Sequence, residues 1–80
     1  MNIQLIHGQF SAKDAIDIIT QMINVKIKFH ENKIAVIDGE EAIKMREKRI
    51  KDLQRDLQHA REHILVNGKS ISMESAIQLT

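Results

Sequence analysis

The sequence of 80 residues contains no cysteine, which excludes both a disulfide framework and a thiolate zinc site. We therefore expect a reducing compartment and a cytoplasmic protein. A chain of this length buries only about 60% of its unfolded surface, so a single domain is marginally stable without disulfides or a metal. Oligomerisation is the remaining way to stabilise it.

The sequence also has few aromatic residues and almost no net charge. Phe10 and Phe29 are the only aromatic residues apart from histidine. The chain therefore has few side chains for base stacking or for aromatic hot spots at an interface. Twelve Lys and Arg residues against eleven Asp and Glu residues give a net charge of +1. This charge produces no overall field that would attract nucleic acid or anionic lipid, so any such binding has to be local.

Long apolar runs and catalytic motifs are missing as well. No run approaches the roughly 20 residues that cross a bilayer, and the N-terminus lacks the basic and then apolar order of a signal peptide. We expect a soluble protein with no membrane partner. The sequence has no Gly-rich phosphate loop, nucleophile elbow or paired carboxylates, so we expect neither an enzyme nor a cofactor.

The longest regular pattern predicts a helix over residues 38–67. Its apolar residues are spaced by seven, three, four, three and four positions, which is typical of one narrow stripe that contacts another helix. These residues are Ile43, Ile50, Leu53, Leu57, Ala60 and Ile64. We expect Asp38 to cap this helix, with Glu41 three positions later, and Gly68 to end it. The narrow stripe has to be covered by another part of the chain.

A second helix is predicted over residues 11–34, where Ser11 and Asp14 form a variant of the capping box. It carries two apolar stripes. The first stripe is Ile16, Ile19, Ile23, Ile27, His30 and Ile34, and the second stripe is Ala15, Ile18, Met22, Val25 and Phe29. A hairpin of two helices buries only one of them, and an exposed apolar surface usually marks an interface.

We therefore expect the chain to associate with itself through the second stripe. The candidate contact residues are Ile18, Met22, Val25 and Phe29.

Residues 24–37 also admit an alternative. They alternate with period two up to His30, continue as an apolar run from Ile34, and have a possible turn between the two segments. This pattern predicts a β-hairpin and an α+β fold. The turn lacks glycine, however, and the first stripe continues at helical spacing through the segment, which favours a helix.

Short strands are predicted at both ends of the chain. In residues 1–7 the apolar side chains alternate until Ile6 breaks the pattern, and Gly8 is expected to open a turn. In residues 70–79 one face carries Ile71, Met73, Ile77 and Leu79. Because antiparallel helices bring both strands to one end of the hairpin, the strands are expected to pair as an antiparallel ribbon. Two chains then have four strands that can form one sheet.

The expected fold is mainly α: a single domain over residues 1–80 with the order β-α-α-β, which dimerises into a four-helix bundle. Its leading function is that of a non-catalytic homodimeric interaction or assembly module with no cofactor. A further protein partner in an unidentified pathway is compatible with this reading.

The alternative function is a small nucleic-acid-binding dimer. The first half of helix 38–67 has an excess of basic residues that can contact phosphates. The candidates are Lys44, Lys48, Arg49, Lys51 and Arg55, with Arg46 nearby. The other interpretation is that these are ordinary flanking residues of the apolar stripe, interleaved with Glu47 and Asp52.

Three histidines are weaker candidates for a site. His59 and His63 are four positions apart on one side of a helix, a spacing that suits a divalent metal, but no third ligand is identifiable and the order differs from that of a zinc-protease helix. We expect both in solvent. His30 belongs to the first stripe, where a hydrogen-bonded histidine at a helix contact is expected in place of a catalytic base.

Overall fold

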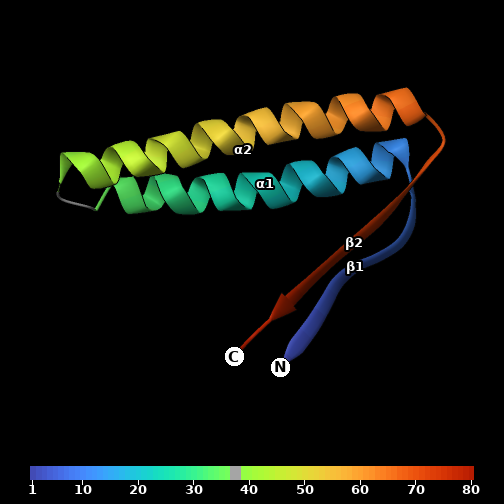
Figure 1. Cartoon of the computed structure of the whole chain (residues 1–80), viewed down its shortest axis with the longest axis horizontal. Helices are drawn as coiled ribbons and strands as arrows, with labels where there is room; N and C mark the ends of the chain where they lie inside the picture. The colour runs from blue at the N-terminus through green and yellow to red at the C-terminus, as the bar shows by residue number, and fades with distance from the viewer. Residues whose placement is uncertain (37–38) are drawn as a thin grey trace.

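The computed structural model describes residues 1–36 and 39–80. The chain runs in the order β1 (Asn2–Ser11), α1 (Ala12–Ile34), α2 (Glu40–Asn67) and β2 (Ser70–Gln78). The helices lie side by side as an antiparallel helical hairpin, and the strands pair as an antiparallel ribbon that leaves one end of it (Figure 1). This confirms the predicted β-α-α-β order and the mainly helical content.

Helix α1 begins where its capping residues predict. The Ser11 hydroxyl accepts a hydrogen bond from the backbone N–H of Asp14 at 3.1 Å, and the helix continues without a break to Ile34. The alternative hairpin is therefore wrong across residues 24–36, while residue 37 lies outside the described part of the chain. Continuity with a capped start and contact with α2 outweigh the local alternation of β-branched residues.

Helix α2 begins at Glu40, with Gly39 at its N-cap position. The predicted cap Asp38 lies outside the described residues. At the other end Gly68 adopts a positive φ of 74° and donates its backbone N–H to the carbonyl oxygen of Ile64 at 3.0 Å, which confirms it as the end of the helix. Within the described residues, neither helix combines the length and apolar content that a membrane crossing requires.

The first strand is longer than predicted. It extends to Ser11, so the predicted end at residue 7 and the predicted turn at Gly8 are wrong: Gly8 lies within the strand, opposite Met73. The reason is a β-bulge at Leu5, where the register shifts between Gln4 and Ile6. The extra residue shifts the alternation of apolar and polar side chains by one position. In the sequence, the strand therefore looks as if it ends there.

The bulge gives the ribbon one apolar face. Ile3 pairs with Ile77 and Ile6 with Ser75. Residues three positions apart point to opposite faces of a regular strand, but the inserted residue puts Ile3 and Ile6 on the same side. That side also carries Phe10 and, on β2, Ile71 and Met73.

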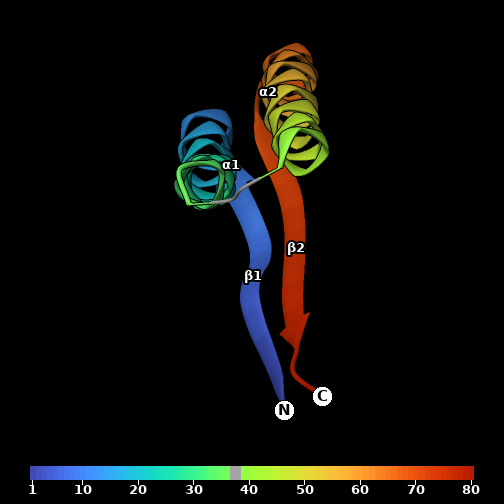
Figure 2. The same ribbon diagram turned by 90° about the vertical axis from the view of Figure 1, so that its left-hand side faces the viewer.

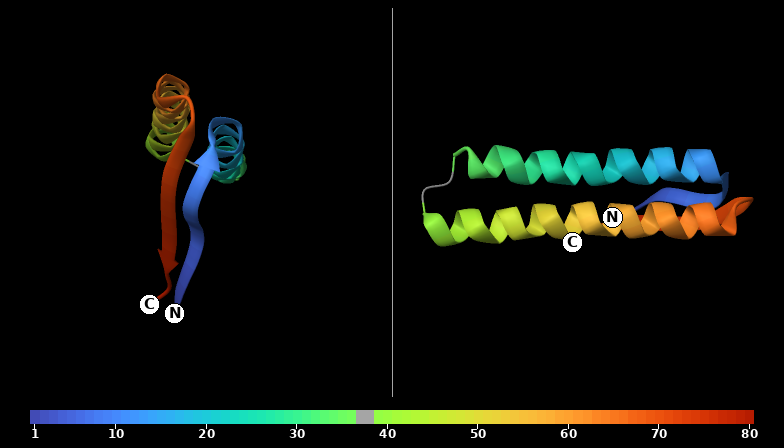
Figure 3. Two further views of the ribbon diagram at one scale, coloured as in Figure 1. Left: turned by 90° about the vertical axis from the view of Figure 1, so that its right-hand side faces the viewer. Right: turned by 90° about the horizontal axis from the view of Figure 1, so that it is seen from above.

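The hydrophobic core of the chain is very small. Among the described residues, only Ala15 and Ile64 are buried, and both lie near the end of the helical hairpin from which the ribbon departs. Views along the helices and from above show the two helices over the start of the ribbon (Figures 2 and 3). Leu53 and Leu57, in the middle of the α2 stripe that another part of the chain has to cover, are only half-buried.

The dimensions agree with this small core. The accessible surface is 6422 Å², whereas a compact monomer of 9.2 kDa exposes about 4,900 Å². The radius of gyration is 15.1 Å, against about 11.6 Å for a compact domain of 80 residues. The chain thus exposes about 1,500 Å² more than a compact monomer of its mass.

Candidate self-association surface

The two stripes of α1 have different environments. The first stripe is half-buried along its length, as expected for the side that faces α2. The second stripe is buried at the ribbon junction and exposed further along α1: Ala15 is 0% exposed, against 37% at Met22, 70% at Val25 and 53% at Phe29. Ile18 is half-buried. The predicted self-association residues thus include three of the exposed large apolar side chains on α1.

The apolar face of the ribbon shows the same trend. Ile71 and Met73, near the helices, are half-buried, whereas Ile77 and Leu79 towards the free end are 41% and 52% exposed. Figure 1 shows the cause: the ribbon slopes away from the helices, and both chain termini lie far from them. Apolar residues on the ribbon and on α1 are therefore left uncovered together.

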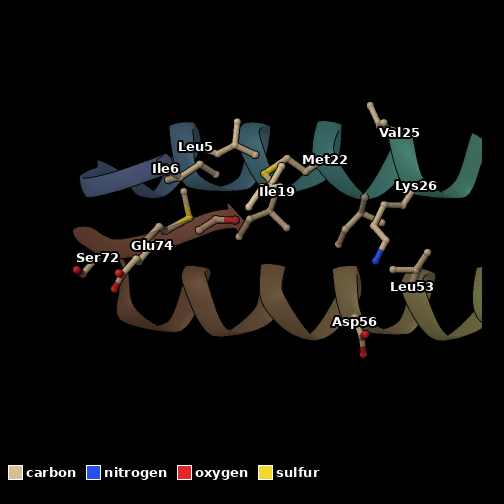
Figure 4. A pocket seen from close by; sticks show the side chains of 14 residues that line it. Leu5, Ile6, Ile19, Met22, Val25, Lys26, Leu53, Asp56, Ser72 and Glu74 are labelled. Atoms are coloured by element: carbon tan, nitrogen blue, oxygen red, sulfur yellow. The ribbon is translucent and has the colours of Figure 1, made fainter. Parts of the chain in front are cut away.

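An open cleft of about 1000 Å³ lies between the ribbon and the helical hairpin. Figure 4 shows its wall of apolar side chains, with three charged side chains among them. The apolar lining comprises Leu5, Ile6, Ile19, Met22, Ile23, Val25, Leu53, Met73 and Ile77, and the charged residues are Lys26, Asp56 and Glu74. This cleft is not predictable from the sequence, because it depends on the angle between ribbon and helices, which no periodic pattern specifies.

Two smaller hollows extend the cleft along the helices. One is lined by Val25, Lys26, Phe29, His30 and Arg49, and the other by His30, Ala42, Met45, Arg46 and Arg49. Val25 and Lys26 also line the cleft, so the three depressions form one continuous surface from the ribbon towards the loop between the helices. We call this surface the apolar face of the hairpin. Met45 is 71% exposed on it and lies outside the predicted stripe.

His30 and Arg46 form a polar contact within this face. Arg46 Nη1 lies 2.9 Å from His30 Nδ1, and because a guanidinium only donates, the imidazole accepts and is neutral. Partial burial, followed by the nearby charges of Arg46, Arg49 and Lys26, lowers the pKa of His30 below its ordinary value. Arg46 also lies 5.8 Å from the ring centroid of Phe29. His30 is thus a hydrogen-bonded histidine between the helices, as expected.

Acid is expected to destabilise the protein through His30. Because the pKa of His30 is lower in the folded state, its contribution to stability is complete above the ordinary value near 6.5 and is lost as the pH falls through the folded-state value. Urea denaturation between pH 8 and 5.5 should show this loss. His30→Asn retains an acceptor without titrating, so its decline should be shallower. Equal declines would contradict the assignment.

The basic candidates on α2 do not all lie on one surface. Lys44, Lys48, Lys51 and Arg55 follow helical spacing along the side of α2 away from the apolar stripe, whereas Arg49 lines the hollows of the apolar face. Several cations are paired with acids. Lys48 Nζ and Arg55 Nη2 each lie 3.2 Å from a carboxylate oxygen of Asp52, and Lys44 Nζ lies 3.9 Å from Glu40 Oε1. The hydrogen bond from Lys48 lowers the pKa of Asp52.

The other two histidines have no metal-binding arrangement around them. Across residues 1–36 and 39–80, no three His, Cys, Asp or Glu side chains are grouped to hold a metal ion. His63 Nε2 lies 3.2 Å from Asn67 Nδ2, which also donates to the carbonyl oxygen of His63 at 2.8 Å. Both His59 and His63 are exposed, as the sequence predicts.

No family model matches this sequence, and no curated protein or solved structure is significantly similar to it. The feature that bears on function is therefore the apolar face of the hairpin together with the cleft beside it.

Proposed function

We propose that the protein is a homodimeric, non-catalytic interaction module in which two helical hairpins associate through their apolar faces to form a four-helix bundle. The observation that carries this proposal is the exposure of one continuous apolar face on a protomer with only two buried residues among those described. An apolar face of this kind is unfavourable in water and is typical of an interface.

The amount of exposed surface supports a stable dimer. Covering the excess of about 1,500 Å² on each of two protomers buries about 3,000 Å² in total. Interfaces of obligate homodimers bury about 2,000 to 5,000 Å² and are more apolar than those of transient complexes. The dimer therefore supplies the core that the protomer lacks.

In such a dimer the apolar faces are occupied by self-association. A further protein partner then has the polar outer sides of the helices and the edges of the ribbon available to it. A ribbon edge presents backbone N–H and C=O groups that can pair with an added strand. An assembly role for the dimer follows from these remaining surfaces.

Light scattering at micromolar concentration tests the dimer directly. We expect twice the mass of 9.2 kDa. A monomeric mass with the helical signal intact would overturn the proposal, because it would show that the exposed face is stable in water.

Nucleic-acid binding by α2 is the competing proposal, supported by the four cations on one helix side. The leading proposal predicts no gel shift of duplex DNA or structured RNA at low salt, because neighbouring acids compensate Lys44, Lys48 and Arg55. A shift that Lys48→Glu with Lys51→Glu weakens, and that Arg49→Glu leaves unchanged, would favour the alternative. Arg49 is the matched control because it lies on the apolar face.

A further inference from the structure

Each protomer carries two exposed apolar patches that are left uncovered by the same divergence. The helix patch consists of Met22, Val25 and Phe29 on α1, and the ribbon patch consists of Leu5, Ile77 and Leu79. Both patches lie away from the junction of ribbon and helices, where Ala15 is buried and Ile71 and Met73 are half-buried. The cleft of about 1000 Å³ separates them. Within one chain the two patches therefore do not pack against each other.

We propose that the ribbon patch of each protomer packs against the helix patch of a second copy, so that two reciprocal contacts close the dimer. This inference rests on the proposed homodimer and adds which surfaces meet in it: the partner's ribbon covers the helix patch, and the rest of the apolar face of the hairpin, around Met45 and Arg49, is left for contact between the helices of the two copies. A two-fold axis requires every contact to occur twice with the roles of the protomers exchanged. When the helix patch of each copy contacts the ribbon patch of the other, the same contact occurs twice and this requirement is met.

The width of the apolar surface on α1 agrees with this arrangement. At 100° per residue, Ala15, Met22 and Phe29 lie within about 40° of one another, and Val25 lies about 40° further round the helix, on the side away from the stripe that faces α2. Contact with α2 and with the diverging ribbon of the same chain leaves Val25 and Phe29 exposed. A ribbon from a second copy has an apolar face that can cover both.

The exposed surface also favours a second copy over a small apolar ligand. A ligand that fills the cleft would cover Met22 and Ile77, but Phe29 and Leu79 do not line the cleft and would stay in water. The reciprocal contact covers both of these residues.

Single-cysteine variants test the contact cleanly, because the natural chain contains no cysteine. Val25→Cys and Ile77→Cys are prepared separately, one with ¹⁵N label, then unfolded together, refolded and oxidised. We expect a mixed disulfide between the labelled and unlabelled chains, identified by mass, as the main product. The matched control replaces Val25→Cys with Lys48→Cys, since the Lys48 side chain is 79% exposed away from the apolar stripe. The control should give only random cross-linking.

The outcomes separate this inference from the proposed function. A dimeric mass with no more mixed disulfide than in the Lys48→Cys control would overturn the reciprocal contact and leave the dimer standing. Predominant Val25–Val25 cross-links would overturn it too, since they would place the two helix patches against each other. A monomeric mass would overturn both.

A measurement on the unmodified chain covers the case in which a variant does not fold. In a dimer of one ¹³C-labelled and one unlabelled copy, filtered NMR experiments report only contacts between copies. We expect methyl contacts between Ile77 and Val25. Contacts between copies that involve helix residues alone would overturn the inference.

Discussion

Replacing Val25 with Glu is expected to abolish the dimer at micromolar concentration. Val25 is 70% exposed in the protomer, so a carboxylate at this position is harmless to an isolated chain. In the proposed dimer the side chain is covered, and an unpaired buried charge costs about 3 to 5 kcal/mol. Since each 1.4 kcal/mol is tenfold in affinity, the dissociation constant should increase by about 10² to 10³ or more.

Loss of the dimer should also unfold the chain. A chain with only two buried residues among those described lacks the core that helices of this polarity require, because helical stability in water comes mostly from packing. Light scattering should therefore report a monomeric mass, and circular dichroism should show a loss of helical signal at the same concentration. Increasing the protein concentration should restore both signals together.

Asn24→Glu is the matched control, because it adds the same charge one residue earlier on a side of α1 that is exposed and polar. It should leave mass and helical signal unchanged. If the Val25 and Asn24 variants remained dimeric alike, the apolar face of the hairpin would not be the interface. If both dissociated, the effect would be one of net charge and not of position.

Elements that depend on local features were predictable from the sequence. The start of α1 follows from Ser11 and Asp14, whose capping bond spans three residues, and the end of α2 follows from the positive φ of Gly68. The end of β1 was not predictable, because the bulge at Leu5 is defined only by pairing with a strand some 70 residues later. The hydrophobic period of either segment alone does not show how it pairs with so distant a strand.

The candidate surface was predictable in part. The second stripe identified Met22, Val25 and Phe29, because an extra apolar stripe on a helix is visible in its spacing. The contribution of the ribbon was missed, since the direction in which it leaves the helices is set by the junctions at Ser11 and Gly68 and not by either strand's pattern. The contact between His30 and Arg46 could have been found: both residues occupy stripe positions of their helices, where a polar side chain needs a partner.

Replacing Ile64 with Ala is expected to cause the largest loss of stability among single truncations in α2. Ile64 is 2% exposed and is the only large side chain buried in the protomer among the described residues. Truncation of a buried isoleucine to alanine costs about 2 to 5 kcal/mol through lost transfer free energy and the cavity left behind. A chain this small has a total stability of about 5 kcal/mol, so the variant should be largely unfolded at physiological temperature.

Val66→Ala removes a similar apolar side chain from a position two residues later that is 86% exposed. It should cost little or slightly stabilise α2, because alanine is the better helix former. Urea denaturation of both variants at one protein concentration measures the difference. Equally mild effects would show that the end of the hairpin near the ribbon is not the packed core of the protomer. A large effect for Ile64 alone, still present at concentrations that saturate the dimer, would separate the packing within a protomer from the contact between protomers that Val25→Glu removes.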